Sequence, residues 1–307
     1  TTIISVVYSL LLFGFTIAFF AEWYRKRDEV ISYRSHGFAM GFILIGFEII
    51  FLLLMAISGD SISNFLAVIF TDTVAFFRIS AFTIIGIYYC AQLGLPSFPF
   101  FLKNLEQVKI EIADSSSGEE KEPSQEPFPI EKDISPFSET IEPVPHSTLV
   151  FPSIEVRDMV LSSLMVALGG ILFSILLFWL TKPTMSAIAQ ANFGQELSMT
   201  NILATLVFVL SFAFAEEIAF RLGIQNFFAQ HFSWQCEKYW LAIILTSFIW
   251  TIGHVGLLEP DWVKMVQIFP VGLALGWLFR KYGVESTIIV HSIFNVVLIW
   301  PSELLIS

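Results

Sequence analysis

Apolar stretches of about the length that crosses a membrane recur along most of the chain. A spanning helix needs about 20 mostly apolar residues. Stretches of this kind cover 3–23, 38–58, 66–97, 159–180, 201–229, 239–257, 265–279 and 286–302. The hydrocarbon interior offers no water to backbone groups, and the stretches lack the period-two alternation of a barrel strand. The sequence therefore predicts an all-α, polytopic membrane helix bundle with about eight transmembrane helices.

The composition supports a membrane protein and argues against a nucleic-acid partner. Only 14% of the 307 residues are charged, whereas soluble domains carry about 25%. The net charge is −11, but residues 104–158 hold 13 Asp and Glu against four Lys and Arg, so this segment supplies −9 of it. The remainder is nearly neutral and has no basic surface for nucleic acid. We expect membrane lipids to surround the protein instead.

The acidic segment also divides the chain. Residues 113–152 contain seven of the 13 prolines and show no helical or alternating period. Such a composition cannot bury enough apolar surface to offset the entropy of ordering, so it predicts disorder. We predict a three-helix membrane unit at 1–102, an acidic, proline-rich, disordered linker at 103–158 and a five-helix unit at 159–307.

Basic residues predict the orientation in the membrane. Twelve of the 16 Lys and Arg residues lie in the loops 24–37, 103–157, 230–238 and 280–285. Short loops rich in Lys and Arg stay on the cytoplasmic side. We therefore predict that the linker 103–158 is cytoplasmic and that both ends of the chain face outward.

Ionisable residues within the apolar stretches are candidates for a functional site, because burying each costs about 2.5–3.5 kcal/mol on insertion scales. Glu217 and Arg221 are four residues apart, so they share a helix face and can pair. Glu216 is rotated by about 100° from Glu217 and is left available for chemistry. His291 and Asn295 also share a face, which brings an imidazole and an amide together.

The candidate residues supply a carboxylate base, two imidazoles and an amide donor. A hydrolase needs a base that deprotonates water and donors that hold the oxyanion. The residues are grouped in Glu216–Arg221 (EEIAFR), Trp250–His254 (WTIGH) and His291–Asn295 (HSIFN). The sequence contains neither HExxH nor GxSxG, so the zincin and α/β-hydrolase arrangements are excluded.

These three motifs, in this order, resemble those of the CAAX protease and bacteriocin-processing family of intramembrane proteases, which includes the type II CAAX prenyl endopeptidases. EEIAFR matches the family's EExxxR, WTIGH is similar to FxxxH and HSIFN matches HxxxN/D. The resemblance covers about residues 200–302. Trp250 replaces the phenylalanine of the second motif, which keeps an aromatic wall but changes its shape. Leu222 stands where relatives often have glycine.

The resemblance implies a role for each motif residue. Glu216 would activate water with help from His254, and His291 and Asn295 would hold the oxyanion. The remaining motif residues would support the site: Glu217, Arg221 and Trp250. Metal dependence stays open, because Glu216, His254 and His291 are residue types that suit Zn²⁺, so the expected cofactor is either none or zinc.

A simple estimate of how deep each motif residue lies in the membrane conflicts with one shared site. At ~1.5 Å per residue across a ~30 Å core, Glu216 and His291 would both lie ~8 Å from the cytoplasmic boundary. His254, about 15 residues into a stretch that starts at 239, would lie near the outer boundary. The groups can meet only if the helix of Glu216 continues well past Arg221, the 239–257 helix starts below the membrane surface, or the helices tilt. We expect the motif residues to meet.

Two functions follow as hypotheses. The first is an endopeptidase of a bacterial cytoplasmic membrane, which hydrolyses a peptide bond of a membrane-associated peptide or protein. The alternative is a catalytically inactive membrane scaffold, immunity factor or subunit with a membrane-protein partner. The additional N-terminal helices and the linker motivate this alternative.

Overall fold

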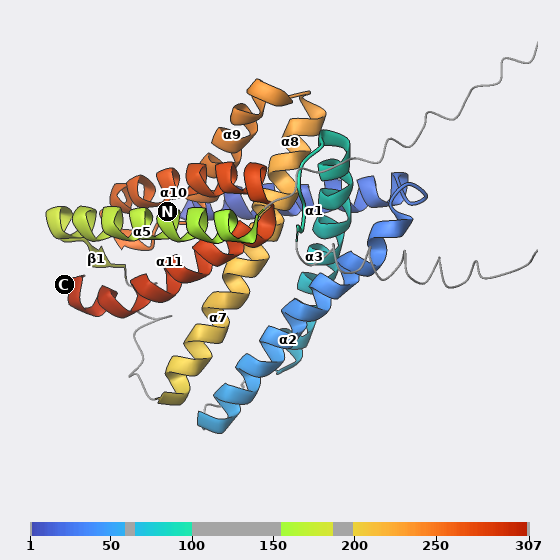
Figure 1. The fold of residues 1–307 in the computed structure, drawn as a ribbon. Coiled ribbons are helices and arrows are strands. Elements are labelled where there is room, and N and C mark those ends of the chain that lie inside the picture. The colour runs from blue at the N-terminus through green and yellow to red at the C-terminus, as the bar shows by residue number, and fades with distance from the viewer. Residues whose placement is uncertain (1, 59–64, 100–154, 187–198, 306–307) are drawn as a thin grey trace, which may run out of the picture. The chain divides into compact units, whose positions relative to one another are not determined.

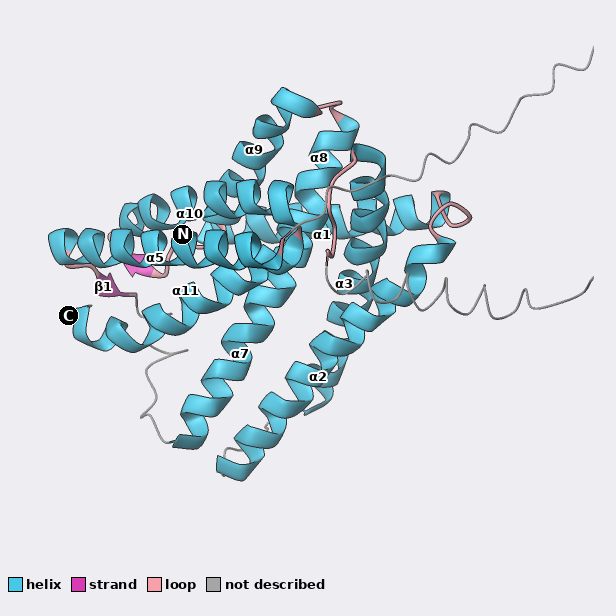
Figure 2. Ribbon diagram, viewed as in Figure 1, coloured by secondary structure: helices cyan, strands magenta, loops and turns pink. Residues whose placement is uncertain are grey.

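The computed structural model describes residues 2–58, 65–99, 155–186 and 199–305 (Figure 1). Nearly all of these residues are helical, as Figure 2 shows. The longer helices are α1 (Thr2–Arg25), α2 (Arg34–Ser58), α3 (Phe65–Leu93), α5 (Val156–Thr181), α7 (Met199–Glu217), α9 (Tyr239–Ile252), α10 (Asp261–Tyr282) and α11 (Val284–Leu305). The shorter ones are η1 (Ile31–Tyr33), the π-helix η2 (Ile218–Gln225), α8 (Asn226–His231) and η3 (Cys236–Lys238).

The structure confirms an all-α, polytopic membrane bundle. Six helical segments of the described residues are long and apolar enough to cross a membrane: Ile3–Arg25, Ile31–Ile57, Thr73–Leu93, Val156–Thr181, Ile202–His231 and Asp261–Tyr282. The two other predicted spans differ. Helix α9 has only 14 residues, and the described apolar part of α11, Val284–Leu298, is also short. The protein is therefore an integral membrane protein, and six of its described helical segments have the length and apolar character of a full span.

A very short sheet is the exception to the helical fold. Strands β1 (Thr184–Met185) and β2 (Leu258–Glu259) pair antiparallel, with Thr184 opposite Glu259. The amide of Ser186 extends the ladder by donating to the carbonyl of Leu257. This ladder ties the segment that follows α5 to the turn between α9 and α10.

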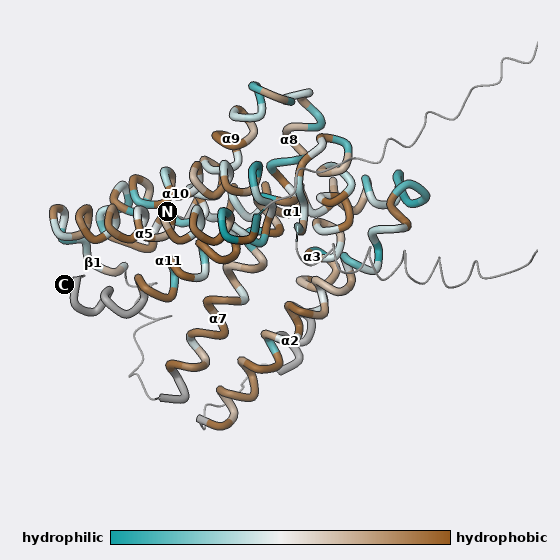
Figure 3. Tube along the Cα trace, viewed as in Figure 1, coloured by the Kyte–Doolittle hydropathy of each residue, from teal (hydrophilic) through white to brown (hydrophobic). Residues whose placement is uncertain are grey.

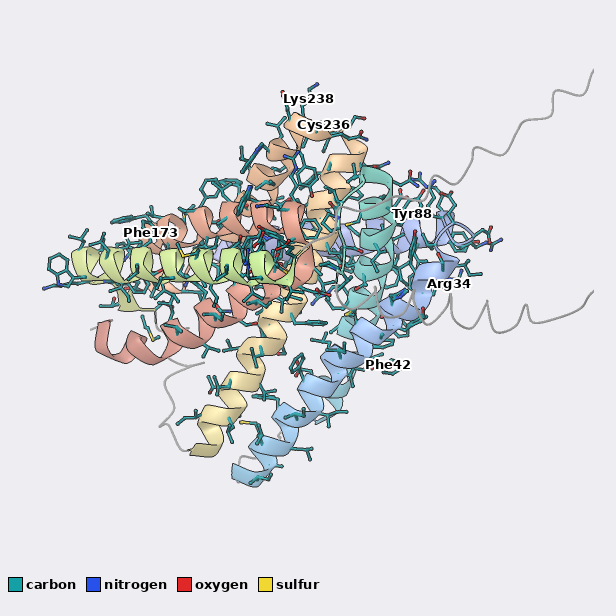
Figure 4. The ribbon with its side chains drawn as sticks, in the orientation of Figure 1. Arg34, Phe42, Tyr88, Phe173, Cys236 and Lys238 are labelled. Atoms are coloured by element: carbon teal, nitrogen blue, oxygen red, sulfur yellow. The ribbon has the colours of Figure 1, made fainter. Side chains whose placement is uncertain are left out.

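Large apolar side chains cover the outside of the spans. Phe42 on α2 and Phe173 on α5, both labelled in Figure 4, are 65% and 37% exposed. The brown, hydrophobic colour runs along α2 and α7 in Figure 3, whereas the turn between α1 and α2 is hydrophilic. Exposed apolar surface of this extent fits contact with lipid.

Helices that precede and follow residues 100–154 form one compact unit, which comprises Thr1–Pro99 and Ser153–Ser307. Helix α2 packs against α3 and α7, and α3 packs against η2. Helix α11 packs against α5, α7 and α10 (Figure 1). The predicted linker, 103–158, lies mainly outside the described residues, so the division of the chain at this segment stays a prediction.

The packing of α3 against η2 depends on Gly86. A Cβ atom at this position would lie 2.6 Å from Cγ of Leu222 and 2.7 Å from its carbonyl oxygen. Both distances are far below van der Waals contact, and a backbone oxygen cannot move aside by changing rotamer. The absent side chain of Gly86 therefore lets α3 pack directly on the helix that carries the candidate site.

We expect Gly86→Ala to lower the free energy of unfolding by about 1–3 kcal/mol, because an extra methyl group in a packed core forces the backbone apart. Thermal unfolding in detergent measures this. Gly46→Ala is the control, since a Cβ at Gly46 on α2 meets nothing within 4 Å. There the helix propensity of alanine should leave stability unchanged or raise it slightly. Equal effects of the two variants would contradict the assigned role of Gly86.

Candidate active site

The two adjacent glutamates at the end of α7 face different surroundings, as their rotation on a helix predicts. The side chain of Glu217 is 1% exposed and its Oε2 lies 3.4 Å from Nε of Arg221, which is fully buried. The side chain of Glu216 is 25% exposed, and its Oε2 accepts a 2.7 Å hydrogen bond from Nε1 of Trp250. One acid is thus paired in the core, while the other remains accessible.

His291, on α11, lies between the two carboxylates. Its Nδ1 is 2.8 Å from Oε1 of Glu217, and its Nε2 is 3.8 Å from Oε2 of Glu216. An ionised carboxylate can only accept a hydrogen bond. Nδ1 therefore donates to the buried Glu217, which orients the ring so that Nε2 faces the accessible glutamate.

The WTIGH motif lies beside the same carboxylate. Nδ1 of His254 donates to the carbonyl oxygen of Trp250 over 2.9 Å. The indole ring of Trp250 makes edge contacts with both imidazoles, with ring centroids 4.9 Å from His254 and 5.3 Å from His291. The structure thus gathers residues of all three motifs around one aromatic ring.

The depth arithmetic that separated His254 from Glu216 is wrong for this fold, because the helical path of Glu216 continues through η2 and α8. The span Ile202–His231 therefore has 30 residues. The continuation of the helix past Arg221 was one of the three arrangements that the sequence allowed.

Asn295 lies on α11 one helical turn after His291 and is partly exposed. Among the side chains that the structure describes, none forms a hydrogen bond with its amide. The i, i+4 spacing of HSIFN therefore gives two donor side chains on one face of α11.

Arg221 is the most buried charge of the site. Its guanidinium carbon lies 5.0 Å from the centroid of the Trp250 ring. No described residue hydrogen-bonds to Nε, Nη1 or Nη2, although Nε lies within ion-pair distance of Glu217. Charge pairing with Glu217 and the π face of Trp250 are thus the contacts that offset the burial of this cation.

The proposed metal ligands do not form a metal site in this arrangement. In the described part of the chain, no three or more His, Cys, Asp or Glu side chains are grouped so that they could hold a metal ion. Glu216, His254 and His291 all belong to that part. The donor set that zinc would need is therefore not assembled, and no chemical step below is assigned to a metal.

Two residues near Glu216 were missed by the sequence analysis. Tyr8, on α1, packs on the WTIGH motif, because a Cβ on Gly253 would lie 2.4 Å from its Cζ. Lys264, on α10, donates to Oε1 of Gln267 over 3.0 Å. Both side chains lie within electrostatic range of Glu216. A lysine at the edge of an apolar stretch was a usable signal, whereas one tyrosine in a first span was not.

Comparisons with known proteins agree with the motifs. Residues 198–297 match the family model described as type II CAAX prenyl endopeptidase Rce1-like. The sporulation-killing factor biosynthesis protein SkfC of Bacillus subtilis (strain 168) is 34% identical over 67 residues, which is 22% of this chain and 14% of that protein. No solved structure matches. The segment 198–297, which carries all three motifs, is thus similar to the Rce1-like type II CAAX prenyl endopeptidases, and the chain spans only a small part of the curated relative that it matches.

Proposed function

We propose that the chain is an intramembrane endopeptidase that hydrolyses a peptide bond of a membrane-associated substrate. One observation carries the proposal: the accessible carboxylate of Glu216 lies 3.8 Å from Nε2 of His291. At this separation the base can reach the attacking water while the donor reaches the carbonyl oxygen of the same peptide bond. The similarity of residues 198–297 to the Rce1-like family model supports the same reaction class.

In the proposed first step, Glu216 takes a proton from water. The resulting hydroxide bonds to the carbonyl carbon of the scissile peptide and gives a tetrahedral oxyanion. When the carbon–nitrogen bond then breaks, the departing nitrogen takes up the proton that Glu216 holds. The products are a peptide with a new carboxylate and a peptide with a new amine.

The oxyanion is assigned to donors on α11. Nε2 of His291 donates only when the ring carries both protons, because Nδ1 already donates to Glu217. The amide of Asn295 supplies a second hydrogen bond from the same helix face. Preorganised donors of this kind are typically worth 10²–10³-fold in kcat each, by the order of magnitude found when one is removed.

The other motif residues hold these groups in place. Glu217 and Arg221 fix the orientation of His291 from the buried side. His254 is assigned to assist Glu216 in handling the water proton, since it packs against the same indole ring. An apolar surrounding keeps bulk water away and strengthens the electrostatic contacts with the oxyanion.

The test compares new peptide termini in membranes that contain the wild-type protein, His291→Ala or no protein. Terminus labelling and mass spectrometry should find cleavage products with the wild type only, because the alanine variant lacks both the donor and its link to Glu217. His231→Ala is the control, since His231 lies at the end of α8 and contacts Glu22.

Insertion of each variant is verified by its amount in the membrane fraction. Unchanged products with His291→Ala would overturn the proposed chemistry. Absence of any products with the wild type, together with a stable co-purified partner, would favour the alternative role as a scaffold or subunit.

A further inference from the structure

We infer that the indole N–H of Trp250 positions the catalytic carboxylate, so that Trp250 is a positioning residue for Glu216 and not only an aromatic wall. This inference rests on the proposed function of Glu216 as the base. The hydrogen bond from Nε1 to Oε2 is 2.7 Å long. That length is typical of a bond between an N–H donor and a charged acceptor, which is about twice as strong as a neutral one.

The hydrogen bond engages one specific oxygen of Glu216. The indole nitrogen can only donate, so it fixes Oε2 and leaves Oε1 without this partner. The carboxylate is 25% exposed, whereas Trp250 is 1% exposed. The accessible group is therefore held from the buried side. We assign Oε1, for which no described residue gives a hydrogen bond, as the oxygen that receives a proton from water.

The indole ring is itself held on several sides. The guanidinium of Arg221 lies over its face at 5.0 Å, and the rings of His254 and His291 contact it edge-on. The backbone carbonyl of Trp250 accepts the hydrogen bond from Nδ1 of His254. A ring restrained in this way cannot turn its N–H away from Glu216 without disturbing the other site residues, so the carboxylate has a fixed direction.

This hydrogen bond depends on Trp250, the residue at which the chain differs from the FxxxH motif that it resembles. A phenylalanine at position 250 would supply the ring but no N–H, and so could not orient Glu216. The tryptophan therefore adds a donor to the carboxylate that the motif's usual residue cannot provide. Loss of the donor alone should misplace the base, and a misplacement of about 1 Å can cost about 10²-fold in rate.

The experiment replaces Trp250 with 3-benzothienylalanine, which keeps the bicyclic shape and puts sulfur in place of N–H. The substrate is a peptide whose cleavage the terminus comparison has identified, and the protein is reconstituted in lipid vesicles. We expect kcat to fall roughly 10- to 100-fold with KM nearly unchanged, because the lost contact acts on the transition state. The control is the same replacement at Trp240, which also lies on α9 but is 43% exposed. The kcat of this control variant should not change.

A spectroscopic measurement tests the contact itself. In protein with ¹⁵N-labelled tryptophan, the indole N–H signal of Trp250 should move in the Glu216→Gln variant, whereas that of Trp240 should not. An unmoved Trp250 signal, or a kcat that survives loss of the N–H, would overturn the inference. If Glu216→Gln also keeps full activity, the proposed function fails; if only the Trp250 replacement is silent, the positioning role alone fails.

Discussion

Replacing Glu216 with glutamine should reduce kcat by about 10²- to 10⁴-fold, the range that general acid–base catalysis contributes. Glutamine has almost the same shape, and its amide oxygen can still accept the hydrogen bond of Trp250. It cannot take a proton from water, so the substitution removes the base while the packing stays intact. The rate is measured on the identified substrate with protein reconstituted in vesicles.

Glu48→Gln is the matched control for this experiment. Glu48 is also a partly exposed glutamate on an apolar helix, α2, but it belongs to none of the three motifs. Its removal should leave kcat within about twofold of the wild type, since the proposed chemistry assigns it no role. If Glu216→Gln cleaves as fast as Glu48→Gln, Glu216 is not the base.

Much of the fold, and several contacts among the motif residues, could be predicted from the sequence. Stretches of about 20 apolar residues leave few alternatives to helices in a membrane. Spacing alone predicted that Glu217 pairs with Arg221, and the ion pair is present at 3.4 Å. Spacing also predicted that Glu216 faces elsewhere, and its carboxylate contacts Trp250 and His291 instead.

The contacts between helices could not be predicted in the same way. Hydropathy does not reveal that η2 continues the helix of Glu216 as a π-helix, because the period of apolar residues changes little over eight residues. Because this continuation was not counted, spans of uniform length gave the wrong depth for Glu216 relative to His254.

The second large effect concerns the stability of the buried ion pair. We expect Arg221→Met to lower the free energy of unfolding by about 3–5 kcal/mol, the cost of leaving one charge of a buried pair without its partner. The carboxylate of Glu217 would then keep its hydrogen bond from His291 but lose the arginine that balances its charge. Thermal unfolding in detergent measures this loss, and Arg157→Met is the control because its pair with Asp158 is exposed.

The double variant Glu217→Gln with Arg221→Met separates a pairing effect from a packing effect. If the single loss arises mainly from an unpaired charge, removing both charges should restore part of it, by a coupling of about 0.5–3 kcal/mol. If the loss arises from the contact between the guanidinium and the Trp250 ring, the double variant should be no more stable than Arg221→Met. Catalysis should be impaired in the double variant, because it lacks the ionised Glu217 whose hydrogen bond from His291 orients the donor that the oxyanion needs. Restored stability without restored activity would therefore assign the ion pair to folding and Glu217 to the chemistry of the site.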